Sequence, residues 1–198
     1  MDVSEPSAPR DVSYAYKPSL VGAPFEFRLT PVGLEWRKGA HSDCIPYPRI
    51  RRLRMSFRPM NLQFHRFVAE IWATGAPKLL IASTTWRSLM EQARQDAEYG
   101  IFIAELHRHL AATGSRASFE VGSPPAVYWI GVAFFAVTCL ALAALIARGL
   151  QSGALAGAAI VGGLLILFLW QVGIFFRRNR PATYRPDALP EQVMPQGW

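Results

Sequence analysis

The sequence predicts an α+β protein, in which a small domain of antiparallel strands and one amphipathic helix precedes a hairpin of two transmembrane helices. Two observations support this prediction. Residues 126–147 and 153–176 contain no Asp, Glu, Lys, Arg or His, and at about 1.5 Å per residue each is long enough as a helix to cross a hydrocarbon core of about 30 Å. Much of residues 25–83, in contrast, alternates apolar with polar side chains, which is the period of a strand that buries one face.

Basic residues flank the two apolar segments on their outer sides. They are Arg108 and Arg116 before the first segment and Arg177, Arg178, Arg180 and Arg185 after the second, whereas the turn at 148–152 has only Arg148. Cytoplasmic loops are enriched in Lys and Arg, so we expect both termini in the cytoplasm. Ionisable residues inside a membrane mark transport pathways. Because these segments contain none, we expect the hairpin to be an anchor in the lipid bilayer.

The composition is typical of a bacterial inner-membrane protein. Its 198 residues carry a formal net charge of +7, and Arg greatly outnumbers Lys, a bias that we associate with GC-rich bacterial genomes. Cys44 and Cys139 fall in a predicted loop and in a transmembrane segment, which excludes a disulfide framework. Residues 1–20 contain three acidic residues and no apolar core. We therefore expect no cleaved signal peptide, and a multi-pass protein.

Composition and periodicity divide the rest of the chain. We expect a flexible, proline-rich arm at 1–24, a domain at 25–114, a linker at 115–125 and a solvated tail at 177–198. Strands are predicted near 25–30, 34–37, 52–58, 64–72 and 78–83. Residues 84–97 fit either a last strand or an early helical turn.

A helix is predicted at 98–112, where the spacing of the apolar residues changes. Tyr99, Phe102, Ile103, Leu106 and Leu110 recur every three or four residues, which places them on one face of a helix. This helix is expected to cover the strands with that face.

The stretch Ile45-Pro46-Tyr47, followed by Ile50 and Leu53, leads into the predicted central strand. With five or more antiparallel strands before one amphipathic helix, residues 25–112 resemble the bacterial pleckstrin-homology-like (PH-like) domains. The resemblance implies a curved sheet or small barrel closed at one end by the helix, with transmembrane segments beside it. It maps no binding site of the family onto particular residues.

Catalytic, cofactor and metal motifs are lacking in the sequence. His107 and His109 are two residues apart on the predicted helix, which places them on different faces, unlike the pairs that bind zinc. We expect both to be solvated surface histidines. His41 and His65 have no neighbouring set of metal ligands. We therefore expect a protein that is not an enzyme and has no cofactor.

Arginine is concentrated on and beside the predicted central strand. The candidate binding residues are Arg49, Arg51, Arg52, Arg54, Arg58 and Arg66. One interpretation is a solvated strand face that discourages pairing of edges. The other is contact with anionic phospholipid headgroups, at about 1 kcal/mol for each Arg. Nucleic acid is disfavoured, because aromatic residues do not alternate with these arginines as stacking platforms require.

The sequence therefore predicts a PH-like interaction module on a two-helix anchor. The expected function is to bind a protein partner, or to organise a complex, at the cytoplasmic face of the membrane. Two alternatives remain open, which are direct binding of anionic lipid headgroups and a role as accessory subunit of a transporter.

Overall fold

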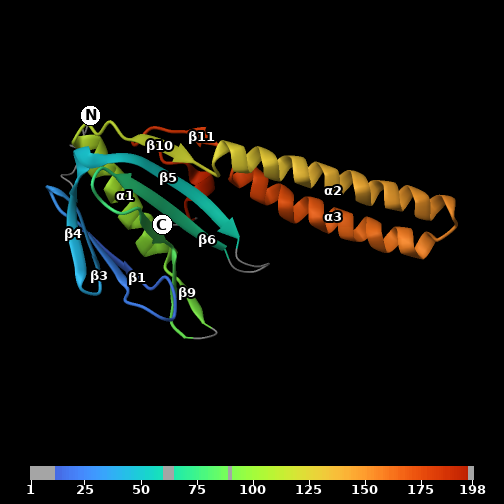
Figure 1. Ribbon diagram of the computed structural model, residues 1–198, viewed down its shortest axis with the longest axis horizontal. Helices are drawn as coiled ribbons and strands as arrows, with labels where there is room; N and C mark the ends of the chain where they lie inside the picture. Colours follow the sequence, from blue (N-terminus) through green and yellow to red (C-terminus); the bar gives the residue numbers. More distant parts are fainter. Residues whose placement is uncertain (1–11, 60–64, 89–90, 196–198) are drawn as a thin grey trace, which may run out of the picture. The chain divides into compact units, whose positions relative to one another are not determined.

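The computed structural model describes residues 12–59, 65–88 and 91–195. The chain forms two compact units: one holds the strands and the first helix and resumes at residue 182, and the other comprises residues 122–181. Antiparallel sheets and three α-helices confirm the predicted α+β class. Figure 1 shows the elements with their labels.

Four antiparallel strands form the first sheet as a meander. They are β1 (Ser13–Tyr16), β2 (Phe25–Leu29), β3 (Gly33–Lys38) and β4 (His41–Pro46). The predicted alternation is present in β2, where Phe27 and Leu29 are buried and Arg28 is exposed. β1 was not predicted, because it lies in the segment expected to be a flexible arm. Tyr14 and Tyr16 of this strand are 4% and 3% exposed, so that expectation is wrong for β1, whereas residues 1–11 lie outside the described residues.

The second sheet has the strand order β11-β10-β5-β6-β7. Its strands are β5 (Ile50–Pro59), β6 (His65–Ala73), β7 (Leu79–Ala82), β10 (Ser118–Val121) and β11 (Ala182–Thr183), and the short 3-10 helix η1 (Tyr47–Arg49) precedes β5. β10 runs parallel to β5, and the other neighbours are antiparallel. Leu53, Met55 and Phe57 of β5 are buried, and the arginines alternate with them, as the sequence predicts.

A small hairpin and the helix α1 follow β7. Strands β8 (Thr84–Trp86) and β9 (Gln92–Arg94) pair with each other, so the ambiguous segment 84–97 contains a short β-hairpin, and its last two residues begin helix α1. Leu89 and Met90 lie outside the described residues. Helix α1 spans Asp96–Ala112 and thus begins two residues before the predicted start.

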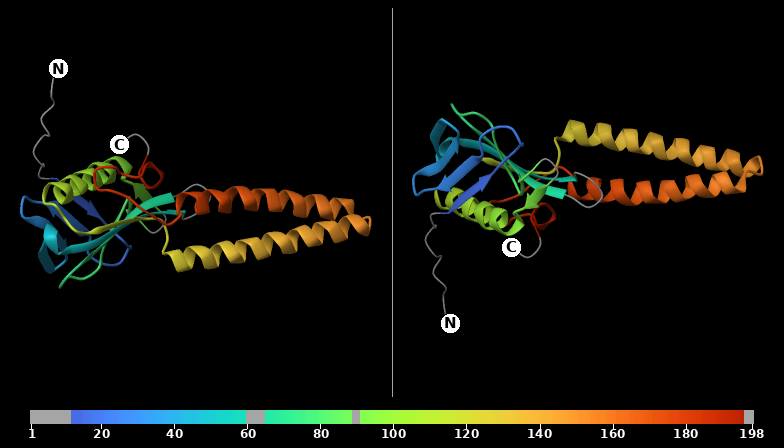
Figure 2. Two further views of the ribbon diagram at one scale, coloured as in Figure 1. Left: turned by 90° about the horizontal axis from the view of Figure 1, so that it is seen from above. Right: turned by 90° about the horizontal axis from the view of Figure 1, so that it is seen from below.

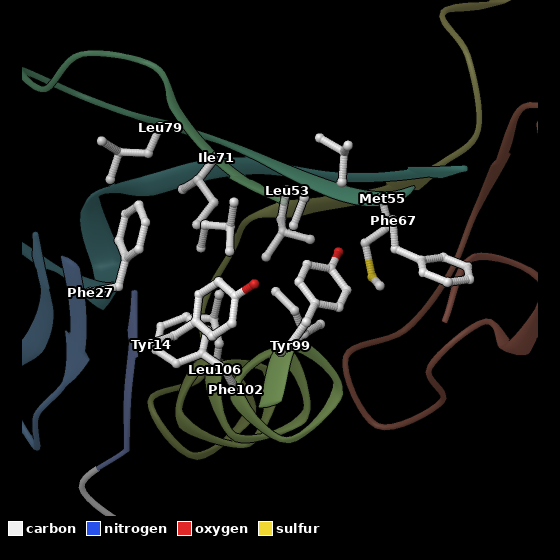
Figure 3. Close-up of a cluster of buried hydrophobic side chains, with 14 of the residues drawn as sticks. Tyr14, Phe27, Leu53, Met55, Phe67, Ile71, Leu79, Tyr99, Phe102 and Leu106 are labelled. Carbon is white, nitrogen blue, oxygen red and sulfur yellow. The ribbon is translucent and has the colours of Figure 1, made fainter. Parts of the chain in front are cut away.

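The core lies between α1 and the two sheets. Tyr99, Phe102 and Leu106 of α1 are fully buried and extend toward Leu53 and Ile71 of the second sheet (Figure 3). Full burial of a large apolar side chain contributes about 1.5–3 kcal/mol. The predicted apolar stripe of this helix is therefore confirmed as its core-facing side.

The second unit is a helical hairpin. Helices α2 (Pro125–Gln151) and α3 (Leu155–Arg178) lie side by side in both views of Figure 2, and each is long and apolar enough to cross a membrane. Gly131 of α2 lies against the ring of Phe176 of α3, and Gly149 lies against Ala158. Small residues at these contacts allow the two helices to approach closely.

The hairpin is inserted between two paired strands. Three residues separate β10 from α2, and three separate α3 from β11; Val121 of β10 pairs with Ala182 of β11. Gly122 has φ +85°, and a Cβ there would clash with the carbonyl oxygens of Asn179 and Arg180. Glycine is therefore required where the chain leaves β10.

The structure differs from the expectation of a linker at 115–125 and a solvated tail at 177–198. The first segment contains β10, and the second contains β11 and the 3-10 helix η2 (Glu191–Val193), whose Val193 is fully buried. Val193 and Met194 belong to the same core cluster as the sheet residues. These elements form through pairing and packing with distant strands, which local periodicity does not reveal.

Candidate functional site: the cationic face of the five-stranded sheet

Most of the predicted arginines share the face of the second sheet that points away from α1. Arg52, Arg54 and Arg58 extend from β5 on this face, and Arg66 of β6 lies directly opposite Arg58. Arg49 and Arg51 are exposed beside them, and Arg51 donates a hydrogen bond from Nε to Oγ1 of Thr74 at 3.0 Å. We use the term cationic face for Arg52, Arg54, Arg58, Arg66, Lys78, Glu70, Glu120, Trp72 and Ser56.

Two of the arginines are bound by Glu120 of β10. Arg54 donates from Nε and Nη2 to Oε2 of Glu120 at 3.0 and 2.6 Å, and Arg52 Nε lies 3.4 Å from the other carboxylate oxygen. The Arg54 side chain is only 11% exposed, so it belongs to a partly buried ion pair and is not a solvated group. The parallel pairing of β10 with β5 places Glu120 beside Arg54.

A second carboxylate, Glu70 of β6, also accepts from two cations. Arg58 Nη2 and Lys78 Nζ lie 3.0 and 2.7 Å from Oε1 of Glu70, and the Glu70 side chain is 8% exposed. An ionised carboxylate in such a buried position requires cationic or hydrogen-bonding partners. The positive charge of the predicted arginines is therefore partly neutralised by acids from other strands.

The ring of Trp72 lies among the cations of this face. Lys78 Nζ, Arg52 Cζ and Arg54 Cζ lie 4.8, 5.2 and 5.4 Å from its centroid. A cation over an indole ring contributes about 0.5–1 kcal/mol at an exposed site. Trp72 is half-buried on β6 opposite Arg52, so it combines a large apolar surface with neighbouring positive charge.

Sequence reasoning missed Glu70, Trp72, Lys78 and Glu120. The alternation of β6 already placed Glu70 and Trp72 on the face opposite Phe67, together with Arg66. What the sequence could not supply was the register that sets each acid against particular arginines. Glu120 in particular precedes the hairpin by a few residues and reaches β5 only because β10 joins the sheet.

The two histidines of α1 are buried, so the expectation of surface histidines is wrong. His107 and His109 are 1% and 3% exposed. His107 Nδ1 lies 2.7 Å from the carbonyl oxygen of Ile103, and Nε2 lies 2.8 Å from the hydroxyl of Tyr184. Burial lowers the pKa of His107 to about 4, although the Ile103 carbonyl opposes this shift. Tyr184 of the returning tail covers His107, whereas the ring of His109 stacks on Tyr47 of η1, with 5.0 Å between the ring centroids.

A shallow hollow lies on the first sheet. It has a volume of about 720 Å³, and its lining includes Glu26, Arg37 and Cys44. Arg37 donates a hydrogen bond from Nε to Glu26 Oε2 at 3.0 Å. Burial, followed by the nearby carboxylates of Glu35 and Asp43, raises the pKa of the Cys44 thiol, which disfavours the thiolate needed for nucleophilic chemistry.

The described residues contain no group of three or more His, Cys, Asp and Glu side chains that could hold a metal ion. The cationic face is thus the strongest candidate site. Comparison of the chain with known protein families, with curated proteins and with solved structures finds no match.

Proposed function

We propose that this chain is a non-enzymatic, membrane-anchored interaction module, which binds an acidic protein partner at the cytoplasmic face of a bacterial inner membrane. The hairpin anchors the protein, with both termini in the cytoplasm, and the cationic face binds the partner. A PH-like fold for the sheet domain is part of the proposal. Strands β1 to β9 precede helix α1, and the resemblance implies five or more strands before one helix.

The main support is the short connection, at both ends, between the hairpin and two strands of the sheet. Both ends of the hairpin continue within three residues into β10 and β11, which pair with each other. A three-residue connection reaches at most about 11 Å, so neither end of the hairpin is a long flexible tether. Tethering at a membrane raises the effective concentration of the domain for partners in that membrane, and a modest affinity then suffices.

The chemistry of the cationic face supports the proposal of an acidic partner. Five cationic side chains and two carboxylates contribute to it, together with the ring of Trp72. Trp and Arg are the residues that most often dominate binding at protein interfaces. The excess of positive charge favours a negatively charged surface, because complementary charge steers association and disfavours other partners.

Affinity purification of the full chain in detergent tests the partner. We expect Trp72→Ala and Arg52→Glu each to lose one bound protein that the wild type retains, and raised salt to release it. Arg37→Glu, on the first sheet, is the matched control and should retain the same protein. Recovery of identical proteins with all four chains would contradict binding through the cationic face, and a protein that is always retained would indicate the accessory-subunit alternative, with contact through the helices.

The lipid alternative is supported by the same excess of charge. It predicts that the full chain unfolds at a higher temperature in nanodiscs with anionic lipid than in neutral nanodiscs, and that Arg52→Glu removes this difference. A wild-type protein that is insensitive to lipid charge would exclude it.

Thiol labelling of Cys44 and of a cysteine introduced into the turn of the hairpin tests the orientation. In intact cells we expect Cys44 to be protected from a membrane-impermeant reagent, whereas Ser152→Cys, in the turn of the hairpin, should react. Inverted membrane vesicles should give the opposite pattern. Labelling of Cys44 in intact cells would place the sheet domain on the other side of the membrane.

A further inference from the structure

One part of the cationic face has positive charge that the sheet does not neutralise. Arg58 and Arg66 are directly opposite each other on neighbouring strands. Like charges in this arrangement repel each other and destabilise the pairing of the strands. Arg58 bonds to Glu70, but this carboxylate also accepts from Lys78. Arg58 and Lys78 therefore share one acid at this end of the sheet, and Arg66 adds a third positive charge beside Arg58.

Arg66 is the least satisfied of these cations. Its Nε is buried and has no hydrogen-bond partner among the described residues. Burial, and next the nearby guanidinium of Arg58, lower the pKa of Arg66. A buried donor without a partner costs about 1–3 kcal/mol, and more when it is charged, so a ligand that accepts from it would recover this free energy.

Ser56 provides a third donor on the same face. It precedes Arg58 by two residues on β5 and lies diagonal to Arg66, because its direct partner on β6 is Val68. Such diagonal neighbours are within reach of long side chains. Ser56 is 6% exposed, and its buried hydroxyl has no partner among the residues described.

We propose that Arg58, Arg66 and Ser56 form a binding site for a phosphate group, either in inorganic phosphate or in the monoester headgroup of a lipid. A phosphate group offers three or four acceptor oxygens to two guanidinium groups and a hydroxyl, and guanidinium forks match its geometry. A ligand with a carboxylate would offer only two acceptor oxygens. Glu70, the neighbouring carboxylate of the protein, already accepts from Arg58 and Lys78. Phosphate binding at this site does not require the protein partner proposed above, so the two proposals can fail independently.

The test uses the full chain in phosphatidylcholine nanodiscs, titrated with inorganic phosphate at constant ionic strength. We expect phosphate to raise the thermal midpoint of the wild type above that in chloride, by preferential binding to the folded state. Arg66→Gln should weaken phosphate binding about 10-fold or more. Arg87→Gln removes the same charge from an exposed position outside the site and should bind like the wild type.

Ser56→Ala separates binding from folding. It removes a buried hydroxyl without a partner, so the midpoint without phosphate should stay the same or rise, whereas phosphate affinity should fall about 5-fold. Unchanged affinity in Ser56→Ala would overturn the three-donor site. Equal losses in Arg66→Gln and Arg87→Gln would show that the response is a general effect of charge, and would also overturn it.

A second set of nanodiscs distinguishes the source of the phosphate. Phosphatidic acid carries a phosphate monoester headgroup, and it replaces part of the phosphatidylcholine in these discs. Stabilisation by phosphatidic acid that Arg66→Gln abolishes, without a response to inorganic phosphate, identifies the lipid headgroup. Stabilisation by inorganic phosphate in neutral discs identifies a soluble ligand. The absence of stabilisation in both sets would overturn the proposal.

Discussion

The two faces of strand β5 are stabilised by different interactions. On the core side, Leu53 and Met55 are fully buried and pack under helix α1. On the opposite side, Arg54 and Arg58 bind carboxylates that come from β10 and β6. The core face requires only apolar residues at alternate positions, whereas the cationic face requires particular partners in a particular register. The first face can therefore be predicted from one strand alone, and the second cannot.

The largest effect on the free energy of unfolding is expected when a core residue of β5 is compared with an arginine on its opposite face. Leu53→Ala should lower the free energy of unfolding by about 2–5 kcal/mol, because it removes buried methyl groups and leaves a cavity. Arg52→Ala, at the preceding position, should cost less than about 1 kcal/mol, because the pair with Glu120 spans 3.4 Å and the Arg52 side chain is 45% exposed. Urea unfolding of the full chain in detergent, followed by near-ultraviolet circular dichroism, measures both. Similar losses would show that the cationic face contributes to folding as much as the core.

A second prediction concerns the titration of the buried His107 of helix α1. The folded pKa of His107 is about 4, below the ordinary value of about 6.5, so the unfolded chain takes up this proton first as the pH falls. Stability due to His107 is therefore complete above about pH 6.5 and decreases toward pH 4, by at most about 1.4 kcal/mol per pH unit. Unfolding curves at pH 7, 6 and 5 measure this slope.

The matched variants for this titration are His107→Gln and His41→Gln. The first should flatten the pH dependence between pH 7 and 5, because it removes the buried imidazole. His41 is exposed at the start of β4, and its replacement should leave the slope unchanged. A wild-type slope that persists in His107→Gln would assign the pH dependence to other groups.

The sequence predicted those parts of the fold that depend on local periodicity. The strand alternation of β5, the apolar stripe of α1 and the two long apolar helices are each visible within a short segment. The burial of His107 was not predictable in this way, because Tyr184, which covers it, follows 77 residues later, after the hairpin. A helix face without apolar residues is expected to be solvated unless a distant segment returns to cover it.

The candidate site shows the same limit. Six arginines were recognised from the sequence, but the carboxylates that bind them were not, because Glu70 and Glu120 are 12 and 66 residues from their arginine partners. Alternation assigns a residue to a face, whereas strand order and register decide its neighbours. Only the structure therefore distinguishes Arg54, which is paired, from Arg66, whose buried Nε has no partner among the described residues.

The smallest differences in the free energy of unfolding are expected between ion pairs on the outer faces of the two sheets. Glu70 is 8% exposed and accepts from two cations, so Glu70→Gln would leave Arg58 and Lys78 without their shared charge partner. Both cations are more than 40% exposed, and solvent would screen much of the loss. We expect a decrease of about 1–2 kcal/mol in the free energy of unfolding.

Glu26→Gln is the matched change on the first sheet. The side chains of Glu26 and its partner Arg37 are 44% and 63% exposed, so this pair is solvated on both sides and should contribute less than about 0.5 kcal/mol. Raising the salt concentration to 1 M should remove what remains of that contribution, whereas the larger part of the Glu70 contribution should persist, because buried charges are screened less by ions. Equal effects of the two variants would mean that Glu70 is as solvated as Glu26. The cationic face would then be a loose charged surface, without the fixed geometry that the proposed phosphate site requires.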